Sequence, residues 1–362
     1  MGDGDDMNFT ETIFITGFPG FIAERLTARL ARHDVQFYLL VQPQFVEKAI
    51  SAVEEIARRT RTPLENFALI EGDITRENLG IAAEDLETIR GETTDVFHLA
   101  AAYDLEVSKD IAYQVNLEGT KNVNELARSM PDLRRYNYVS TCYVAGKRKG
   151  RILESELGHE AGFRNFYEET KCLAEMEVEK LKGDLSVTIF RPSVVVGDSE
   201  TGETAKYDGI YYLIQYLRKA PNFLRFINVG NTEVRLNLVP VDFVVEAIAE
   251  LSKEEAGIGK TIALADPSPL TTKELFDTIA ENMTGKRSAL GPPPALVEKF
   301  LMLPVSPPVT GLPHSGVPYF FLSQTYDTSV ADELLGRHNI TCPNFRDYVG
   351  NLLKFVEKHP NL

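Results

Sequence analysis

The sequence has 362 residues, of which 43% are hydrophobic and 25% charged, a composition typical of a soluble globular chain with a substantial core. Lys and Arg number 38 against 53 Asp and Glu, so the net charge is −15. This acidic balance argues against a nucleic-acid-binding surface, which needs concentrated positive charge. The composition therefore excludes disordered and fibrous classes, and an anionic ligand would need a local basic site.

Three cysteines, Cys142, Cys172 and Cys342, are too few and too scattered for a disulfide framework or a thiol metal cage. They favour a reducing, cytoplasmic compartment, and we predict no metal site. No run of about 18 apolar residues is present, so no membrane-spanning segment is expected. Residues 1–10 are acidic and polar, unlike a signal peptide, and we expect a mobile tail there.

Short apolar runs alternate with helical periods along the first 200 residues. The runs read as buried strands at 12–16, 36–41, 67–70, 95–99, 136–140 and 186–190. The helical periods lie at about 20–32, 44–59, 108–129 and 166–182. Strict alternation predicts an α/β fold with a Rossmann-type doubly wound parallel sheet, covered by helices on both faces.

The pattern changes after about residue 200. We expect helices at 207–219, 241–252, 328–337 and 344–358, and strands at 234–238 and 261–265, the last of which could rejoin the main sheet. Residues 292–318 hold eight of the 19 prolines, which predicts an ordered loop or lid. We predict a nucleotide-binding domain of 11–205 plus about 241–266, and a substrate-binding domain of about 206–240 and 267–362 with a proline-rich apolar segment at 292–326.

The first strand runs directly into a glycine-containing loop that precedes a helix. Gly17 allows a tight turn, Gly20 lets backbone amides approach a pyrophosphate, and Ala23 allows the helix to pack closely on the sheet. A glycine pattern alone often marks only a turn, but here strand, glycines and helix follow the order of a dinucleotide site. The predicted contacts in this loop are Thr16, Gly17, Phe18, Pro19, Gly20, Phe21 and Ile22.

Later strand ends support the same site. Asp73 can accept a hydrogen bond from an adenine amino group, or it can cap a turn. His98 precedes small residues where a cofactor would pass, or it is a satisfied strand-end side chain. The predicted contacts here are Asp73, Ile74, Leu99, Ala100 and Ala101.

The residue after the second strand, which usually reads the adenosine ribose, is Gln42. An acid there would bind the two ribose hydroxyls and repel a 2′-phosphate. Its absence favours NADP(H), but no arginine is present either, and the first cation is Lys48. We predict NADP(H), with NAD(H) as the alternative.

Tyr167 and Lys171 stand four residues apart on one face of a predicted helix. The ordinary pKa of tyrosine is about 10, so a nearby ammonium would make Tyr167 a usable acid or base near neutral pH. We expect Lys171 to lower the pKa of Tyr167 and to bind the ribose. Ser140 and Thr141 end the preceding strand, and one of their hydroxyls is expected beside Tyr167. Alternatively, the spacing of Tyr167 and Lys171 is a chance pattern on the protein surface, and the hydroxyls of Ser140 and Thr141 only cap the end of the strand.

Several motifs together resemble the extended short-chain dehydrogenase/reductases over about residues 12–200. They are Thr16-Gly-x-x-Gly-x-x-Ala23, Gly72-Asp73, the Ser140-Thr141 strand end, Tyr167-x-x-x-Lys171 and Arg191-Pro192-Ser193-Val194-Val-Val-Gly197. The resemblance implies that Thr141 is the catalytic hydroxyl, with Ser140 as the second candidate, and that Asn116 occupies the family's Asn-x-x-Gly-Thr helix position. It also implies cofactor contacts from Tyr167, Lys171, Arg191, Pro192, Ser193 and Val194.

Within this superfamily the chain looks most like the fatty acyl reductase and thioester reductase branch, whose NAD-binding domain is called male-sterility-like. The likeness lies in 139–144, 167–171 and the turn at 197–202. Phe18-Pro19 in the first loop and the missing arginine after the second strand depart from that branch.

Two segments bear on the substrate. The basic run 147–151 could hold the phosphates of coenzyme A or of a carrier-protein arm, although a solvated loop is the commoner interpretation. Residues 300–326 contain no Asp, Glu, Lys or Arg. They are read as core of the second domain, as the wall of an acyl tunnel, or as a shallow membrane or partner contact. The predicted substrate contacts are Tyr103, Cys142, Tyr143, Lys147, Arg148, Phe166, Tyr319 and Phe320.

The predicted function is NAD(P)H-dependent reduction of the carbonyl of a hydrophobic acyl substrate. The substrate would be a fatty acyl thioester of coenzyme A or a carrier protein, or the derived aldehyde. Thr141 would bind the oxygen, Tyr167 would donate a proton, and Lys171 would support Tyr167. A ketone reductase, hydroxyl dehydrogenase or sugar-nucleotide epimerase is the alternative within the superfamily, and an NADP-sensing regulator without turnover is another.

Overall fold

The computed structural model describes residues 9–219, 228–288, 290–304, 306–307 and 312–362. The chain forms two compact units, the first of Met1–Val144, Phe163–Arg191 and Val245–Ile262, and the second of Ala145–Gly162, Pro192–Val244 and Ala263–Leu362. Residues 145–162 and 192–205 are grouped with the second unit. Most of the predicted tail, residues 1–8, lies outside the described residues, whereas the Thr10 hydroxyl donates to the Asp34 carboxylate at 2.6 Å and is anchored.

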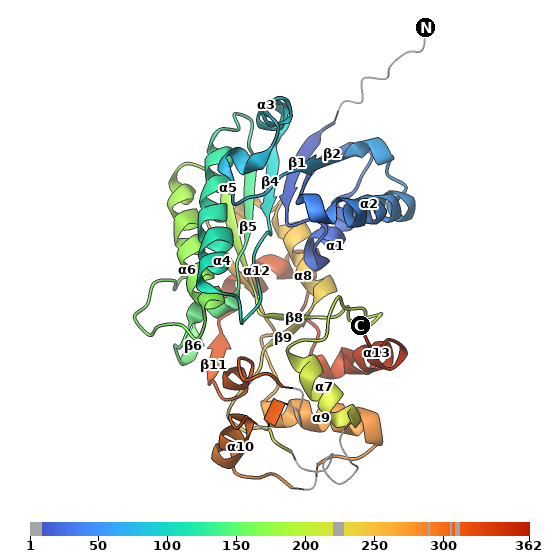
Figure 1. The fold of residues 1–362 in the computed structure, drawn as a ribbon, viewed down its shortest axis with the longest axis vertical. Helices are drawn as coiled ribbons and strands as arrows, with labels where there is room; N and C mark the ends of the chain where they lie inside the picture. Colours follow the sequence, from blue (N-terminus) through green and yellow to red (C-terminus); the bar gives the residue numbers. More distant parts are fainter. Residues whose placement is uncertain (1–8, 220–227, 289, 305, 308–311) are drawn as a thin grey trace. The chain divides into compact units, whose positions relative to one another are not determined.

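A seven-stranded sheet, built largely from the first unit, has the strand order β10-β7-β5-β4-β1-β2-β3 (Figure 1). Its strands are β1 (Glu11–Thr16), β2 (Val35–Val41), β3 (Phe67–Glu71), β4 (Asp95–His98), β5 (Arg135–Val139), β7 (Val187–Pro192) and β10 (Thr261–Leu264). The pairs from β3 through β7 are parallel. All six strands predicted in the first 200 residues are present, and the strand predicted at 261–265 joins the sheet. The doubly wound parallel fold is therefore confirmed.

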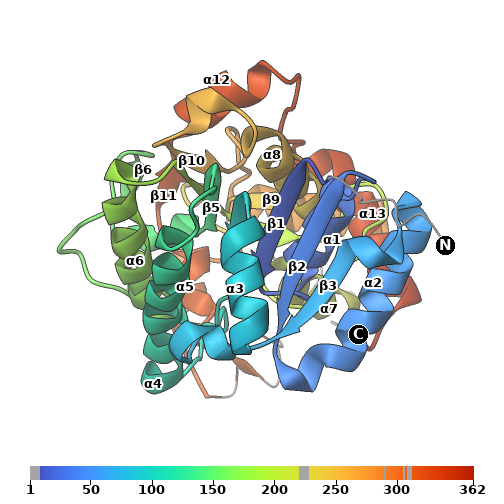
Figure 2. The same cartoon turned by 90° about the horizontal axis from the view of Figure 1, so that it is seen from above.

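Helices cover both faces of this sheet (Figures 1 and 2). One side carries α1 (Phe21–Leu30) and α2 (Val46–Thr60), and the other carries α3 (Ala83–Glu92), α4 (Lys109–Ala112), α5 (Gly119–Arg128) and α6 (Phe166–Glu179). On the second side, Phe14 and Tyr38 of the strands belong to one buried cluster with Val123 of α5 and Val178 of α6. This apolar contact fixes the helices on the sheet, because burial of such side chains contributes roughly 1.5–3 kcal/mol each.

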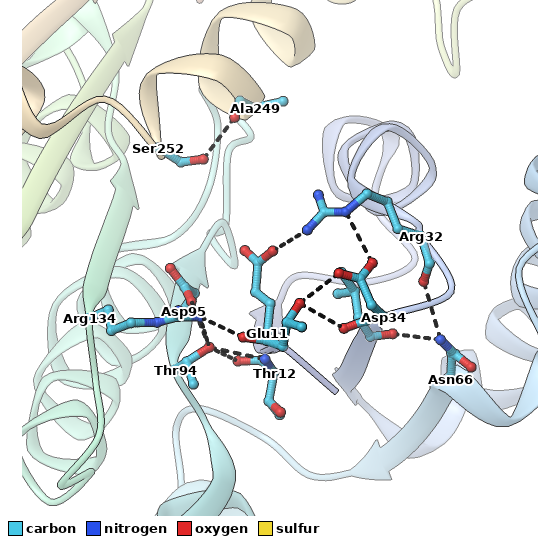
Figure 3. Close-up of polar contacts among 12 residues, drawn as sticks. Glu11, Thr12, Arg32, Asp34, Asn66, Thr94, Asp95, Arg134, Ala249 and Ser252 are labelled. Carbon is cyan, nitrogen blue, oxygen red and sulfur yellow. Dashed lines mark hydrogen bonds and ion pairs between the residues drawn. The ribbon is translucent and has the colours of Figure 1, made fainter. Parts of the chain in front are cut away.

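Ion pairs join the amino ends of the strands, at the sheet edge where β1 and β4 begin (Figure 3). Arg32 donates to Glu11 at 2.6 Å and to Asp34 at 3.4 Å, and Arg134 donates to Asp95 at 3.2 Å. Glu11 and Asp95 are the first residues of β1 and β4. These ion pairs link neighbouring segments at the amino edge of the sheet. Ligands of parallel α/β sheets bind at the opposite edge, where the strands have their carboxyl ends.

The second unit combines helices with two short parallel strand pairs, β6 with β11 and β8 with β9. These strands are β6 (Gly150–Ile152), β8 (Val194–Val196), β9 (Leu238–Pro240) and β11 (Gln324–Tyr326). The helices are α7 (Ile210–Lys219), α9 (Thr272–Thr284), α10 (Pro294–Leu301), α12 (Ser329–Gly336) and α13 (Phe345–Lys358); α8 (Val241–Leu251) passes from the second unit into the first. Tyr211, Phe276 and Tyr348 lie in the core of the second unit.

Two expectations for the second unit are wrong. The strand predicted at 234–238 is instead β9, which begins at Leu238, and Arg235 makes only an isolated bridge with Thr271. The proline-rich segment was expected to be a loop or lid, but part of it is helical. Helix α10 begins there at Pro294. A proline in the first turn of a helix removes no hydrogen bond that the helix needs. Residues 305 and 308–311 of that segment lie outside the described residues.

Candidate active site

The glycine loop lies against the end of β4, where the strand order of the sheet reverses. Thr16 pairs in register with His98. A Cβ atom on Gly17, whose φ is +88°, would lie 2.8 Å from the amide nitrogen of Ala100. A Cβ atom on Gly20 would lie 2.6 Å from the Gly17 carbonyl oxygen. Only glycine fits at either position, so the backbone has the close approach that a dinucleotide cradle requires.

The remainder of the loop is fixed by its neighbours. Phe18 is buried, and Lys48 of α2 donates from Nζ to the carbonyl oxygen of Pro19 at 3.0 Å. Gly20 is the N-cap of α1 and has no side chain to cap the first-turn amides. The positive end of the helix dipole therefore adjoins the glycine loop, as anion binding requires.

The ends of β2 and β3 are linked by side chains. Gln42 donates from Nε2 to Asp73 at 3.0 Å, and the amide of Thr75 donates to the same carboxylate at 2.9 Å. Burial would raise the pKa of Asp73, but these hydrogen bonds lower it below its usual value. Asp73 thus caps the turn after β3, as one interpretation of the sequence had it. Nearby, a Cβ atom on Gly119 would lie 2.7 Å from Ile74 Cδ1, so this glycine allows α5 to pack closely.

Thr141, which follows β5, lies beside Tyr167, in the first turn of α6, and lowers the pKa of its phenol. Asn165 caps α6 by accepting from the Glu168 amide at 3.0 Å, and Arg164 pairs with the Glu168 carboxylate at 2.5 Å. Burial raises the pKa of Tyr167 to about 12, while the neighbouring Thr141 hydroxyl opposes that rise. The phenol is therefore protonated at neutral pH, which is the state that a proton donor needs.

Lys171 does not act on Tyr167 in the way expected. Its Nζ donates to the Tyr138 hydroxyl and to the Val139 carbonyl, both at 2.9 Å. Burial lowers the pKa of Lys171 to about 7, with Glu175 opposing. Lys171 is not among the groups that shift the pKa of Tyr167.

Glu175 is a buried member of this region that sequence reasoning missed. Arg191 donates to its carboxylate from Nε at 2.9 Å and from Nη2 at 2.5 Å, and the Ser140 hydroxyl donates to it as well. The helical spacing of Tyr167, Lys171 and Glu175 places all three on one face, and that signal could have found it. Ser140 and Arg191 are therefore engaged by Glu175, and the structure brings Thr141, not Ser140, to Tyr167.

Asn116 lies in a π-helical turn, Tyr113–Glu118, that interrupts the helix predicted at 108–129. Its Oδ1 accepts from the Ala102 amide at 2.8 Å, and its Nδ2 donates to the Ala102 carbonyl at 3.1 Å and to Thr170 Oγ1 at 3.0 Å. The side chain therefore joins the segment after β4 to α6. π-Helical turns are often found at functional sites.

The predicted substrate contacts of the first unit differ in exposure. Tyr103 and Phe166 are exposed, and Tyr143 is partly buried. Cys142 is buried, and its thiol donates to the Arg191 carbonyl at 3.1 Å, so the small-core interpretation fits this residue.

In the second unit, the basic run is partly neutralised. Arg148 pairs with Glu156 at 3.4 Å, and Arg151 pairs with Asp327. Lys147 is exposed. The cationic spot predicted from the sequence is therefore weaker than its composition suggests.

The other predicted residues of the second unit contribute to its packing. Ser193, between Pro192 and Val194, donates from Oγ to Asn237 at 2.8 Å. Tyr319 is buried, and Phe320 packs against two apolar clusters.

The charge-free segment 300–326 is partly core. Leu301, Leu312 and Val317 are buried together, whereas Phe300 and Met302 are exposed. The core interpretation therefore holds for some of its described residues. Within the described part of the chain, no helix has the length and apolar character needed to cross a membrane.

Comparison with known proteins agrees with this arrangement. The family described as male sterility protein, an NAD-binding domain family, matches residues 15–248. The chain is 25% identical over 272 residues to the fatty acyl-CoA reductase wat of Drosophila melanogaster and 26% identical over 275 residues to human fatty acyl-CoA reductase 1. Each alignment covers 65% of this chain and 53% of the relative. The chain thus spans about half the length of these curated relatives.

Two solved structures share the fold across 97% of this chain. The terminal R domain of the myxalamid PKS-NRPS pathway is 21% identical, with a TM-score of 0.79 over 92% of its own chain. An archaeal non-ribosomal peptide synthetase thiolation-reductase di-domain is 16% identical, with a TM-score of 0.74 over 76% of its chain. From the family match over most of its length, the chain belongs to the male sterility protein family of NAD-binding domains.

Proposed function

We propose that this chain is an NAD(P)H-dependent oxidoreductase that reduces the carbonyl group of a fatty acyl thioester. The observation that carries the proposal is the placement of the Thr141 hydroxyl beside the Tyr167 phenol, whose pKa it lowers, at the carboxyl edge of the sheet. The same edge carries a glycine loop with room for a dinucleotide backbone. Similarity to proteins named fatty acyl-CoA reductases supports the acyl thioester as substrate.

A bound nicotinamide supplies a hydride to the carbonyl carbon. Thr141 donates a hydrogen bond to the carbonyl oxygen, and Tyr167 transfers its phenolic proton to that oxygen as the carbon is reduced. Loss of the thiol from the resulting thiohemiacetal gives an aldehyde, and a second reduction to the alcohol would use the same two side chains and a second molecule of NAD(P)H. Lys171 holds the cofactor ribose through an N–H donor.

NADP(H) is the proposed cofactor, with NAD(H) as the alternative. Gln42 is a neutral amide already bonded to Asp73, so no acid at the end of β2 repels a 2′-phosphate. Lys48 is fixed beside the glycine loop by its bond to Pro19, and its ammonium supplies the positive charge that a 2′-phosphate needs.

The second unit is proposed to bind the acyl group and its carrier, either coenzyme A or a carrier protein. Its many apolar residues in the charge-free segment 300–326 suit a hydrophobic chain, since each buried methylene contributes about 0.8 kcal/mol. The exposed side chains of Phe300 and Met302 fit a peripheral membrane contact as well. A cytoplasmic location is proposed because none of the three cysteines forms a disulfide.

A substrate panel tests the proposal. The purified chain is incubated with NADPH or NADH and with long-chain acyl-CoA thioesters, the matching aldehydes, ketones and a nucleotide sugar. We expect NADPH consumption with the thioesters and aldehydes, rising with chain length. Turnover confined to ketones or to the nucleotide sugar would replace the proposed function by one of its superfamily alternatives. Binding of NADPH without any turnover would indicate a regulator.

A further inference from the structure

A chain of buried polar side chains runs from the glycine loop to Lys171 inside the first unit. Thr16, His98, Thr120, Tyr138 and Lys171 are each at most 3% exposed. Thr16 Oγ1 lies 2.7 Å from His98 Nδ1, and Thr120 Oγ1 lies 3.0 Å from His98 Nε2. Thr120 is among the groups that shift the pKa of Tyr138, and the Tyr138 hydroxyl oxygen accepts from Lys171 Nζ. Polar groups buried this deeply are costly unless their hydrogen bonds are satisfied.

The donor in each of these bonds can be assigned from the Thr120 end. Thr120 donates its single hydroxyl proton to the Asn116 carbonyl at 2.6 Å, so its oxygen must accept from His98 Nε2. Burial raises the pKa of Tyr138 well above its usual value, so the phenol keeps its proton near neutral pH. The Tyr138 oxygen is then available to accept from Lys171.

The other end of the chain gives the same assignment. Thr16 Oγ1 accepts from the Leu99 amide at 3.2 Å and from the Ala100 amide at 3.1 Å, and donates to His98 Nδ1. His98 is therefore neutral, with its proton on Nε2. Burial and then the nearby charge of Lys171 lower the pKa of His98 to about 3, so this tautomer persists near neutral pH.

The Lys171 amine is held from two directions on β5. Its Nζ lies 2.9 Å from both the Tyr138 hydroxyl and the Val139 carbonyl, and 4.5 Å from the centre of the Tyr138 ring. An ammonium has three N–H donors, and two are used by described residues. The titratable groups around it are Tyr138 on β5, His98 on β4 and Glu175 on α6.

We infer that Tyr138 is a positioning residue that holds the Lys171 ammonium, through its hydroxyl oxygen and its ring face, with the third N–H left for a bound dinucleotide. The predicted effect on turnover rests on the proposed function. The contact between Tyr138 and Lys171 does not, because it is present in the folded chain without any ligand. A phenylalanine at 138 keeps the ring and loses the oxygen. The charged amine then loses one of its two hydrogen bonds, and the neutral form becomes easier to reach.

The strand offers a matched control. Tyr136 lies two residues earlier, on the same face of β5, and is buried like Tyr138. Its hydroxyl donates to Asn124 Oδ1 at 2.6 Å. Tyr136→Phe therefore removes one buried tyrosine hydrogen bond of the same strand without removing a partner of Lys171.

NMR titration of the chain with ¹³C-labelled lysine side chains tests the inference, with the Lys171 signal assigned by Lys171→Arg. We expect Lys171 in Tyr138→Phe to bind its proton about tenfold more weakly than in wild type, since hydrogen bonds to charged groups are worth that much or more. Tyr136→Phe should titrate like wild type. If Lys171 titrates identically in Tyr138→Phe and wild type, the inference is overturned.

Kinetics separate this inference from the proposed function. In Tyr138→Phe we expect kcat with NADPH and an acyl thioester to fall about tenfold and its alkaline limb to move to lower pH, with kcat of Tyr136→Phe within twofold of wild type. A wild-type chain that reduces no acyl thioester contradicts the proposed function, and the NMR titration still decides the role of Tyr138. Should Tyr138→Phe not fold, the chain can be labelled uniformly with 3-fluorotyrosine, whose oxygen is a weaker hydrogen-bond acceptor, and Lys171 should then bind its proton more weakly than in the unlabelled chain. An unchanged Lys171 titration in the fluorotyrosine chain would then overturn the inference.

Discussion

A Cβ atom on Gly17 would lie 2.8 Å from the amide nitrogen of Ala100. The first crossover loop and the end of β4 therefore touch through backbone alone, at the point where the strand order of the sheet reverses. This contact is what makes the carboxyl edge of the sheet suitable for a pyrophosphate, which must approach backbone amides closely.

Gly17→Ala should abolish NADPH binding and lower the free energy of unfolding by about 1–3 kcal/mol, because the new Cβ both collides and strains a left-handed backbone. Gly91→Ala is the matched control, since nothing lies within 4 Å of a Cβ at that helical position. It should leave NADPH binding unchanged and stabilise the chain by about 0.5–1 kcal/mol. Fluorescence titration with NADPH and urea unfolding measure both effects; equal binding by the two variants would contradict the cradle.

Substitution of Thr141 and Ser140, one at a time, distinguishes the roles of these two neighbouring hydroxyls. Thr141→Ala should lower kcat by about 10²-fold with little loss of stability, because the Thr141 hydroxyl lies beside the Tyr167 phenol. Ser140→Ala should leave kcat within about threefold and lower the unfolding free energy by about 1–3 kcal/mol, because the buried Glu175 loses a donor. Thr141→Ser should restore most of the activity. The reverse pattern, with Ser140→Ala inactive, would assign the catalytic hydroxyl to Ser140.

Lys48 should set the preference for NADPH. Lys48→Gln is expected to raise the Kd for NADPH about tenfold or more and to leave the Kd for NADH unchanged, because only NADPH carries the 2′-phosphate. Arg59→Gln removes the same charge from the same helix about 16 Å away and should change neither Kd. Calorimetric titration with both cofactors decides, and equal losses for NADPH and NADH in Lys48→Gln would exclude a 2′-phosphate contact.

His98 should make the chain sensitive to acid. Its folded pKa is about 3, whereas an unfolded histidine titrates near 6.5, so the unfolded chain takes up a proton that the folded chain does not. The stability contributed by neutral His98 is complete above pH 6.5 and is lost as the pH falls toward 3. Urea unfolding from pH 7 to pH 4 should show the stability advantage of wild type over His98→Gln shrinking by up to about 1.4 kcal/mol per pH unit. A pH-independent difference would mean that His98 is not buried as a neutral ring.

The sequence predicts the sheet well, because strands buried on both faces read as continuous apolar runs. Helix α3 was missed because Leu86 and Ile89 are its only buried apolar side chains. Helix α9 carries a capping box of Thr271 and Glu274, a local signal that periodicity alone does not use.

In the site, the motif spacing predicts that Thr141 and Tyr167 are neighbours, and Thr141 is among the groups that shift the pKa of Tyr167. Tyr138 could not be identified this way, because a tyrosine within a buried strand looks like core. Its contact with Lys171 exists only once α6 packs against β5. The pKa of Tyr167 was wrongly expected to fall for the same reason, since spacing along a helix does not show where a lysine amine is bonded.

The most direct test of the account is the rate of NADPH oxidation, with aldehyde or alcohol formation measured in parallel, when the purified chain meets a long-chain acyl-CoA. We predict that wild type forms reduced product in proportion to NADPH consumed and that Tyr167→Phe, folded as judged by its unfolding curve, is slower by about 10²–10⁴-fold. Equal rates in wild type and Tyr167→Phe, or a wild type that binds NADPH and reduces no thioester, would contradict it.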